Sequence, residues 1–230
     1  MATTSTREDK EIRYIAFFDL DRTITKAISG RALAREALRR GLLKGSDLAV
    51  ALYFGMFYRL MLADPVMIMV KMTGWVKGIS QETLTDLCQE VFRKVMLPSI
   101  HPEVFEELKM HRENNALTVI LSSSLVPMCK SVAEYLEMDD IVCSELEVKD
   151  GYLTGKPEGN LCYGDEKLVR LKEYCEKNNT TTADAWYYGD AIVDQPALSI
   201  VGHPVCVNPD HKLKRVAEKA RIQPASRALV

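Results

Sequence analysis

Short apolar runs that end abruptly in polar residues recur along this chain and predict buried parallel strands. They cover residues 14–19 (YIAFFD), 117–121 (LTVIL), 185–188 (AWYY) and 204–207 (PVCV). Stretches with helical periodicity follow the runs or separate them, at residues 102–114, 126–137, 166–178 and 211–221. Because strands alternate with helices, we predict an α/β fold with a Rossmann-like parallel sheet and helices on both faces.

Residues 27–99 break this alternation, because they contain helical stretches and no convincing strand. The stretches lie at residues 30–40, 47–62, 65–75 and 81–95. We therefore predict a helical cap subdomain over residues 27–99, inserted into an α/β core that residues 1–26 and 100–230 form together. Within the core, residues 141–154 predict a β-hairpin that turns at Asp150 and Gly151.

The composition is that of an ordinary globular protein, with 47% hydrophobic and 27% charged residues and a net charge of -2. Lysines and arginines are scattered, so no nucleic-acid partner is expected. The six cysteines form no CxxC pair and predict buried thiols in a reducing cytoplasm. Residues 1–13 are polar and charged, which does not resemble a signal peptide.

Residues 48–76 are rich in Leu, Met, Tyr and Phe, which raises the question of a membrane segment. Arg59, Asp64, Pro65 and Lys71 interrupt the stretch, and a membrane-spanning helix needs about 20 apolar residues. We predict buried helices rather than membrane insertion, with an interfacial surface as the alternative. An apolar stripe at helical spacing is interpreted as core of the insert that lies partly over the site: Tyr53, Met56, Phe57, Leu60 and Met61.

Two carboxylates close the first predicted strand in the sequence Asp19-Leu20-Asp21-Arg22-Thr23. Side chains at positions i and i+2 of an extended chain face the same side, so Asp19 and Asp21 repel unless a cation or a shared proton lies between them. With oxygen ligands alone, Mg²⁺ is the natural candidate. A solvated acidic loop is the alternative for this motif taken singly.

Three further polar groups follow in order and favour a phosphate-binding site. Ser122 comes after the second apolar run, where its hydroxyl and the neighbouring N–H groups at a helix start, including that of Ser123, can hold phosphoryl oxygens. Lys167 opens a later helix, and its ammonium can pair with the anionic cluster. Asp190 and Asp194 follow the third run and offer further carboxylates to the metal and its surroundings.

These four elements, in this order, resemble the motifs of the haloacid dehalogenase superfamily of phosphatases. The helical insert between the first and second motifs resembles that of subfamily IB, the phosphoserine phosphatase-like branch. The sequences GYLTG, CYGDEKLVRL and VNPDHKLKRVA are also similar to that branch. The resemblance covers nearly the whole chain.

The resemblance implies a Mg²⁺-dependent, cytoplasmic phosphoric monoester hydrolase that forms an aspartyl-phosphate. Asp19 is then the nucleophile, and Asp21 protonates the leaving alcohol and later activates water. Metal ligands would be Asp19, the backbone carbonyl of Asp21 and Asp190, with Asp194 supporting them. Phosphate binding is assigned to Thr23, Ser122, Ser123 and Lys167.

The substrate is expected to be a small-molecule phosphate ester, and one departure from the family pattern argues against phosphoserine. Enzymes specific for phosphoserine carry an acidic residue shortly after the first motif, whereas no acid occurs here before Glu36. Lys26, Arg31 and Arg35 are interpreted as a solvated helix face, with recognition of an anionic substrate group as the alternative.

Other reactions remain as alternatives. A phosphomutase or phosphotransferase would use the same aspartyl-phosphate, and a non-catalytic phosphate-binding module would use the site without turnover. A dehalogenase is disfavoured, because those enzymes lack the second aspartate of the first motif, here Asp21. Fold alone does not decide between these activities.

Overall fold

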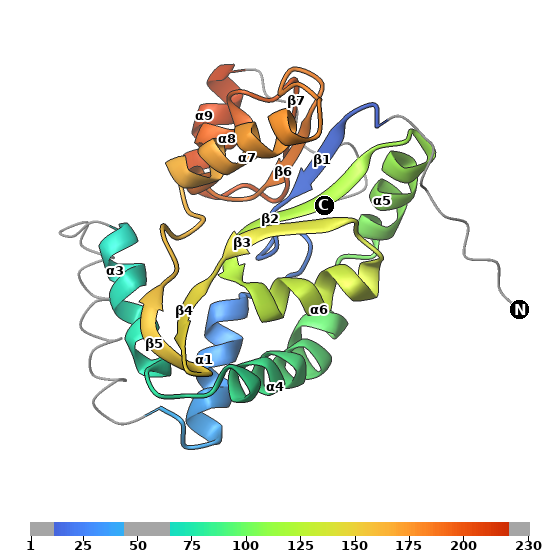
Figure 1. Ribbon diagram of the computed structural model, residues 1–230. Coiled ribbons are helices and arrows are strands. Elements are labelled where there is room, and N and C mark those ends of the chain that lie inside the picture. Colours follow the sequence, from blue (N-terminus) through green and yellow to red (C-terminus); the bar gives the residue numbers. More distant parts are fainter. Residues whose placement is uncertain (1–11, 44–64, 221–230) are drawn as a thin grey trace, which may run out of the picture.

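The computed structural model describes residues 12–43 and 65–220 of the chain, and Figure 1 shows its helices and strands. The first half contains β1 (Ile15–Phe18), α1 (Ser29–Arg39), α3 (Pro65–Met72), the 3-10 helix η1 (Thr73–Val76), α4 (Gln81–Val91), the π-helix η2 (Phe92–Met96), the 3-10 helix η3 (Leu97–Ser99) and α5 (Glu103–Glu113). The second half contains β2 (Leu117–Leu125), α6 (Val126–Leu136), β3 (Asp140–Ser144), β4 (Leu146–Lys149), β5 (Tyr152–Pro157), α7 (Asp165–Lys177), β6 (Trp186–Gly189), the 3-10 helix η4 (Ile192–Asp194), α8 (Gln195–Leu198), β7 (His203–Cys206) and α9 (His211–Ala220).

The main sheet has five parallel strands in the order β3-β2-β1-β6-β7. The four apolar runs became β1, β2, β6 and β7, which confirms the predicted Rossmann-like α/β class. The chain builds β2 and β3 on one side of β1 and then crosses to place β6 and β7 on the other side. The strand order therefore reverses between β1 and β6, and ligands of such sheets bind beyond the carboxyl ends at this reversal.

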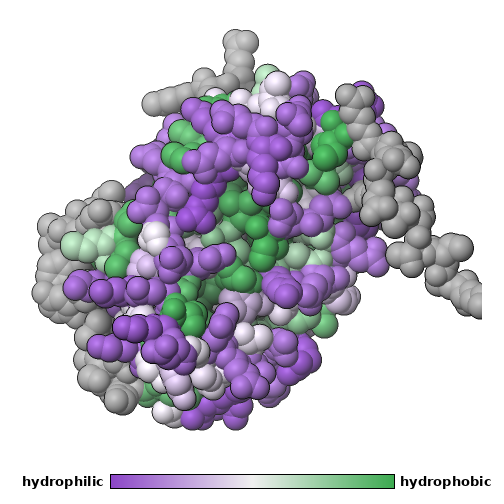
Figure 2. All heavy atoms as spheres, viewed as in Figure 1, coloured by the Kyte–Doolittle hydropathy of each residue, from purple (hydrophilic) through white to green (hydrophobic). Residues whose placement is uncertain are grey.

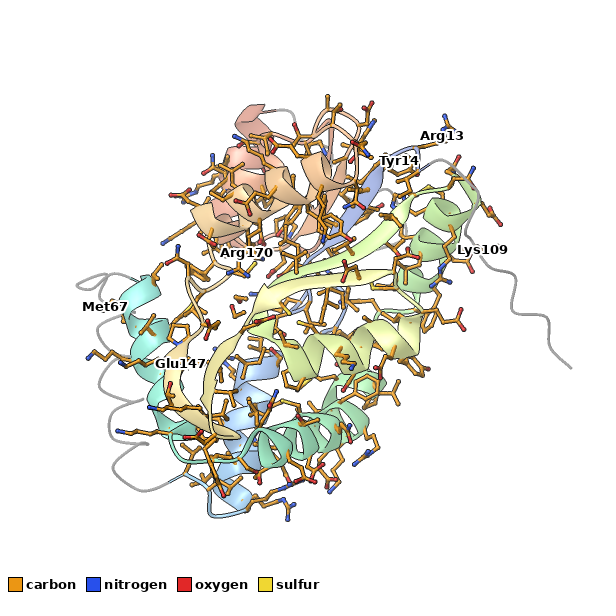
Figure 3. The ribbon with its side chains drawn as sticks, viewed as in Figure 1. Arg13, Tyr14, Met67, Lys109, Glu147 and Arg170 are labelled. Atoms are coloured by element: carbon orange, nitrogen blue, oxygen red, sulfur yellow. The ribbon has the colours of Figure 1, made fainter. Side chains whose placement is uncertain are left out.

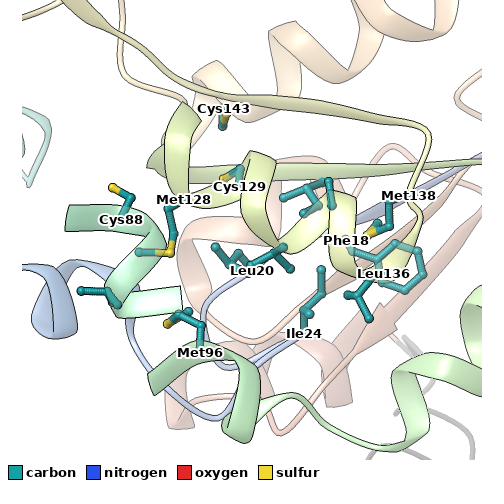
Figure 4. Packing of buried hydrophobic residues seen from close by; sticks show 14 of the residues in the cluster. Phe18, Leu20, Ile24, Cys88, Met96, Met128, Cys129, Leu136, Met138 and Cys143 are labelled. Carbon is teal, nitrogen blue, oxygen red and sulfur yellow. The ribbon is translucent and has the colours of Figure 1, made fainter. Parts of the chain in front are cut away.

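Alternate side chains of β1 enter two hydrophobic cores, one on each face of the sheet. Ile15 and Phe17 pack with buried residues of α7, α8 and α9. Ala16 and Phe18 pack with α5, α6 and the insert, so this core continues from the sheet into the predicted cap. Figure 4 shows part of this second core, with Phe18 beside Leu136 and with Cys88 and Met96 of the insert close by.

Residues 141–154 differ from the prediction of a single hairpin. Their first part belongs to β3, which pairs in parallel with β2 as an edge strand of the main sheet. Only β4 and β5 form the expected antiparallel hairpin, and its turn does fall at Asp150 and Gly151. Only Glu145 separates β3 from β4, so no turn or helix marks the end of β3, and the sequence pattern merged the two.

The hairpin packs on the insert. Leu153 exchanges backbone hydrogen bonds of 2.8 and 2.9 Å with Gly78 and Ile79, and the Thr73 hydroxyl donates to the Gly155 carbonyl at 3.0 Å. Figure 1 accordingly shows β4 and β5 alongside α1, α3 and α4, away from the helices that cover the sheet. The division into a cap over residues 27–99 and a core stays a prediction, and the hairpin packs on the insert although it lies outside that range.

The apolar stretch 48–76 lies largely outside the described residues, and so does the stripe from Tyr53 to Met61. Within the described ranges, no helix combines the length and apolar character that crossing a membrane requires. All six cysteines are buried and free, as predicted from their spacing.

Candidate active site

The carboxyl ends of β1, β2 and β6 bring most of the predicted site residues to one edge of the sheet. Phe18 is paired with Ile120 on one side and with Tyr188 on the other, so Asp19, Ser122 and Asp190 emerge within two residues of the same level. The Asp19 N–H donates to the Tyr188 carbonyl at 2.9 Å, which extends the ladder to the last residue before the loop. Neighbouring strands lie about 4.8 Å apart, so these side chains are close neighbours.

Lys167 forms the centre of the site. It comes from the first turn of α7, and its side chain is only 2% exposed. The ammonium donates to Asp19 Oδ1 at 2.7 Å, to Asp194 Oδ1 at 2.6 Å and to the Tyr187 hydroxyl at 3.1 Å. The three donors of an ammonium are thereby satisfied, and Tyr187 in turn donates to Asp194 Oδ1 at 2.7 Å.

Three buried carboxylates, those of Asp19, Asp190 and Asp194, form an acidic cluster with ligand atoms within 4.8 Å of one another. Burial raises the pKa of Asp19 to about 7, with Lys167 lowering it and Asp194 raising it. Burial likewise raises the pKa of Asp190 to about 7, and the charge of Asp19 adds to that rise. Although burial opposes its charge, Asp19 and Asp194 raise the pKa of Lys167 well above the ordinary value.

The acidic cluster and its surroundings fit a divalent cation. When all three carboxylates are ionised, the ammonium of Lys167 and the half-exposed guanidinium of Arg22 leave a surplus of one negative charge. Among the described residues, two buried side-chain atoms lack a hydrogen-bond partner, Thr23 Oγ1 and Asp190 Oδ2. Buried polar atoms are normally paired, so both atoms are placed to meet a ligand. Carboxylate oxygens of this kind are the donors that Mg²⁺ prefers.

Arg22, the middle residue of the first motif, reaches the acidic cluster. Its side chain is 47% exposed, yet its Nε atom lies 3.4 Å from Asp190 Oδ2. The contact has ion-pair distance without hydrogen-bond geometry, which is why Asp190 Oδ2 still counts as unpaired. Arg22 also has a positive φ of 63°, so the backbone turns sharply inside the first motif.

Asp194 is held in place by the loop that carries it. A Cβ atom on Gly189 would lie 2.9 Å from the Asp194 carboxyl group, so only glycine fits at this position. Asp194 Oδ2 accepts the N–H of Ala191 at 3.2 Å, and Oδ1 accepts from Lys167 and Tyr187. With both oxygens engaged, Asp194 supports Lys167 and the loop more directly than it offers a free ligand atom.

Asp210 is a supporting residue that the sequence motifs did not single out. Its carboxylate accepts the N–H groups of Lys212 and Leu213 at the start of α9 and that of Ile192 in the loop after β6. Its own N–H donates to the Asp190 carbonyl at 2.8 Å. The position of Asp210 just before a helical pattern is a recognisable helix-capping signal. The hydrogen bond from the Asp210 N–H to the Asp190 carbonyl has no such signal in the sequence, because it depends on how the loop folds.

Asp21 lies apart from the acidic cluster and faces the insert. Its Oδ1 and Oδ2 atoms accept the N–H and the hydroxyl of Ser29, each at 2.8 Å. Burial raises the pKa of Asp21, while both bonds from Ser29 oppose that rise. The two carboxylates of the first motif, predicted to face the same side, thus have different partners: Asp19 binds Lys167, and Asp21 binds the first helix of the insert.

The serine motif is placed differently from the prediction of a helix start. Ser122, Ser123 and Ser124 lie in β2, which continues to Leu125 with an irregular register, and α6 begins only at Val126. Ser122 and Ser124 are buried and Ser123 is half-buried. The Ser124 N–H donates to Ser122 Oγ at 3.3 Å. These hydroxyls therefore belong to the strand end next to Asp19, and phosphate binding by Ser122 and Ser123 stays a prediction.

A pocket of about 200 Å³ lies where the insert, the hairpin and the start of α6 meet. Its walls are mostly aliphatic, including Leu84, Leu125, Val126, Leu146 and Leu153, and Leu125 directly follows Ser124. Figure 2 shows hydrophobic side chains across the middle of this face, with hydrophilic surface above and below. Lys26, Arg31 and Arg35 are exposed, in keeping with a solvated face.

Arg170 shows how α7 is fixed to the sheet near this edge. Its guanidinium donates to the Cys143 carbonyl at 2.8 Å and to the Asn160 carbonyl at 2.6 Å. Figure 3 labels Arg170 between α7 and the sheet. Glu166 accepts from Arg170 Nε at 3.1 Å. The helix that carries Lys167 is therefore tied to β3 one turn further along.

The chain is similar in sequence to known phosphatases and hydrolases. A family model described as haloacid dehalogenase-like hydrolase matches residues 16–199. A protein named a probable phosphatase in Mycobacterium tuberculosis is 26% identical over 208 residues, which is 89% of this chain and 72% of that protein. The histidinol-phosphatase of Neisseria meningitidis is 24% identical over 213 residues, 90% of this chain and 96% of that enzyme.

Solved structures share the fold. A Bordetella pertussis protein of unknown function superposes with a TM-score of 0.84 at 22% identity and covers 94% of this chain and 99% of its own. At that level of identity the likeness concerns the architecture alone, including the insert after the first strand.

Proposed function

Because the chain belongs to the haloacid dehalogenase-like hydrolase family, as a phosphatase of that family, we propose that it hydrolyses a small-molecule phosphate monoester through an aspartyl-phosphate on Asp19. The observation that carries the proposal is the buried contact of Asp19 with Lys167 inside a cluster of surplus carboxylates. An anionic nucleophile that approaches an anionic ester needs such positive charge beside it.

In the first step, an oxygen of Asp19 attacks the phosphorus atom of the ester. The new bond from Asp19 to phosphorus forms as the bond from phosphorus to the ester oxygen breaks. The electron pair of the broken bond stays on the leaving oxygen, which takes a proton from the carboxyl group of Asp21. Lys167, 2.7 Å from Asp19, steadies both the carboxylate and the negative charge of the transferring group.

In the second step, the ionised Asp21 accepts a proton from water, whose oxygen attacks phosphorus. The bond between phosphorus and Asp19 breaks, and inorganic phosphate and the free carboxylate of Asp19 result. Asp21 thereby regains the proton that it gave up, and the cycle closes. The hydroxyls of Thr23 and Ser122 and the N–H groups near Ser123 would hold the phosphoryl oxygens.

Mg²⁺ is the proposed cofactor. The side chains of Asp19 and Asp190 and the backbone carbonyl of Asp21 would hold it, with Asp194 bracing the loop through Ala191. When bound, the ion would neutralise the carboxylates and polarise the phosphoryl group. The unpaired Asp190 Oδ2 supports this assignment.

The leaving group is proposed to face the insert, since Asp21, the proton donor, is turned toward α1 and away from the acidic cluster. The aliphatic pocket near Leu125 lies on that side and favours an apolar portion in the leaving group over a compact ionic one. Phosphoserine stays disfavoured, because no acidic residue lies between Asp21 and Glu36. A phosphomutase or phosphotransferase remains the second candidate, because it shares the first step.

The test is hydrolysis of p-nitrophenyl phosphate with and without Mg²⁺, comparing the wild-type protein with Asp19→Asn. We expect metal-dependent release that falls on the order of 10⁴-fold in the variant, because the nucleophile is lost. Acid-quenched protein should carry a phosphoryl group in the wild type and none in the variant. Unchanged activity of Asp19→Asn would refute the nucleophile, and phosphorylation without release of phosphate would favour the transferase.

A further inference from the structure

The first helix of the insert begins in an unusual way. Helix N-termini leave unpaired N–H groups, which Ser, Thr, Asp or Asn at the N-cap position normally satisfies. In α4 this rule holds, because the Ser80 hydroxyl accepts the N–H of Thr83 at 3.1 Å. In α1 the N-cap residue is Ile28, which has no side-chain oxygen, and the first turn contains no acidic residue.

Asp21 takes the place of this missing cap from eight residues upstream. Its carboxylate accepts the N–H of Ser29, the first residue of α1, and the Ser29 hydroxyl as well, both at 2.8 Å. The positive end of the helix dipole favours a carboxylate at this position. Both oxygens of Asp21 are engaged by one residue, so its side-chain rotation is fixed by the insert.

Ser29 also contacts the strand that carries the serine motif. Its hydroxyl oxygen lies in hydrogen-bond contact with the Ser124 hydroxyl, and Ser29 is only 4% exposed. A hydroxyl has one hydrogen, and that of Ser29 points to the carboxylate of Asp21, so Ser124 must be the donor in this contact. Ser124 in turn donates its N–H to Ser122 Oγ. A continuous chain of bonds therefore links Asp21, Ser29, Ser124 and Ser122.

We propose that Ser29 is a positioning residue that orients the Asp21 carboxyl group toward the leaving oxygen of the substrate. Proton donation by Asp21 then depends on the position of α1, the helix that begins with Ser29. This inference rests on the proposed function. Ser29 itself touches neither phosphate nor leaving group; it acts through Asp21. If α1 shifted relative to β2, the bonds of Ser29 to Asp21 and Ser124 could not both persist, and the proton donor would lose its direction.

The test compares two esters that need proton donation to different degrees. The p-nitrophenolate of p-nitrophenyl phosphate leaves easily without a proton, whereas the phenolate of phenyl phosphate is a poorer leaving group. We expect Ser29→Ala to lower kcat/KM for phenyl phosphate at least about tenfold more than for p-nitrophenyl phosphate, within the range that general acids contribute. The quantity kcat/KM reports the steps up to phosphorylation of Asp19, in which the proton is delivered.

Two further variants separate positioning from general damage. Ser131→Ala removes a hydroxyl that donates only to the Pro127 carbonyl within α6, at 3.0 Å, and should leave both rates unchanged. Ser124→Ala keeps both bonds between Ser29 and Asp21, so the ratio of the two esters should stay that of the wild type whatever the absolute rates. Thermal unfolding of each variant checks that it is folded.

An equal loss on both esters in Ser29→Ala, or no loss, would overturn the positioning role. A ratio that moved as far in Ser124→Ala as in Ser29→Ala would overturn it too, because the effect would then not pass through Asp21. If the wild type fails to form an acid-stable phosphoryl group on Asp19, the proposed function itself fails. If it forms one and only the ratio stays constant, the inference about Ser29 alone fails.

Discussion

Two adjacent tyrosines of β6 enter two buried polar networks on opposite faces of the sheet. Tyr187 points to the side of α7, where its hydroxyl joins Lys167 and Asp194. Tyr188 points to the side of α5, where its hydroxyl donates to Glu107 at 2.7 Å and lies 2.9 Å from His111 Nε2. Both tyrosines are almost completely buried, so the two networks differ in the charges they contain and not in the burial of their tyrosines.

The network around Tyr188 is balanced. Because the Tyr188 hydroxyl donates to Glu107, His111 Nε2 must carry the hydrogen that this hydroxyl accepts. His111 Nδ1 then accepts from Tyr14, which Figure 3 labels at the start of β1, at 3.0 Å. Each atom along this chain has a partner, and a neutral His111 suffices.

The network around Tyr187 has a charge surplus instead. Three buried carboxylates face one buried ammonium and the half-exposed guanidinium of Arg22, and within the described part of the chain Asp190 Oδ2 is left without a hydrogen-bond partner. A balanced buried network fixes a structure, whereas a surplus of one sign costs stability unless a ligand completes it. The comparison supports the proposal that the network around Tyr187 belongs to the active site, and each of the following changes tests it.

Lys167→Met should give the largest loss of stability. It leaves the carboxylates of Asp19 and Asp194 buried without their cation, which costs roughly 3–5 kcal/mol in comparable pairs. The deficit should be smaller at about pH 6 than at about pH 8, since protonated carboxyl groups no longer repel one another. Urea denaturation at both pH values, with and without Mg²⁺, measures the effect.

Lys172→Met is the matched control, because Lys172 lies on the same helix and is exposed. A surface change of this kind should alter the free energy of unfolding by no more than about 0.5 kcal/mol. If Lys167→Met proved as harmless as Lys172→Met, the acidic cluster would carry no net charge, and the contrast with the network of Tyr188 would disappear.

His111 should make the balanced network sensitive to acid. Burial, assisted by the charge of His203, lowers the pKa of His111 from 6.5 to about 4. Between these values the unfolded chain binds the extra proton and the folded protein does not, so stability falls as the pH drops from about 6.5 to about 4. The lowered pKa corresponds to about 3 kcal/mol at most.

His111→Gln removes this titration and keeps polar atoms in place. Its free energy of unfolding should therefore change less than that of the wild type between about pH 6.5 and about pH 4. Urea denaturation across this range gives both curves. His211→Gln serves as the control, because His211 is exposed at the start of α9 and lies away from this network. Parallel curves for wild type and His111→Gln would show that His111 is not the sensitive group.

Much of this arrangement could be predicted from the sequence, because buried parallel strands appear in it as continuous apolar runs. The runs located β1, β2, β6 and β7, and the residues after them supplied Asp19, Ser122 and Asp190. The edge strand β3 was not predicted as a separate strand, because its sequence runs into that of β4 with only Glu145 between them.

The partners across the site were harder to foresee. Lys167 was expected to meet the anionic cluster, but its bond to Tyr187 follows from which face of β6 that residue takes. Ser29 was missed because capping rules look for a local oxygen, and the cap of α1 comes from Asp21. The one signal was negative: Ile28 stands where a capping residue belongs.

Removing one hydroxyl from each tyrosine is the smallest and most direct comparison. Tyr188→Phe leaves His111 Nε2 and Glu107 without their shared partner, which should cost about 1–3 kcal/mol of stability. Activity on p-nitrophenyl phosphate should stay within about twofold, as expected for a change remote from the reacting groups.

Tyr187→Phe leaves Lys167 with both carboxylates, so the stability of this variant should fall by about 1 kcal/mol or less. Its activity should fall about tenfold, because the ammonium beside Asp19 loses the bond that orients it. If the same variant lost more stability and more activity, the proposed division would be wrong: the network of Tyr188 would not serve mainly stability, nor that of Tyr187 mainly catalysis.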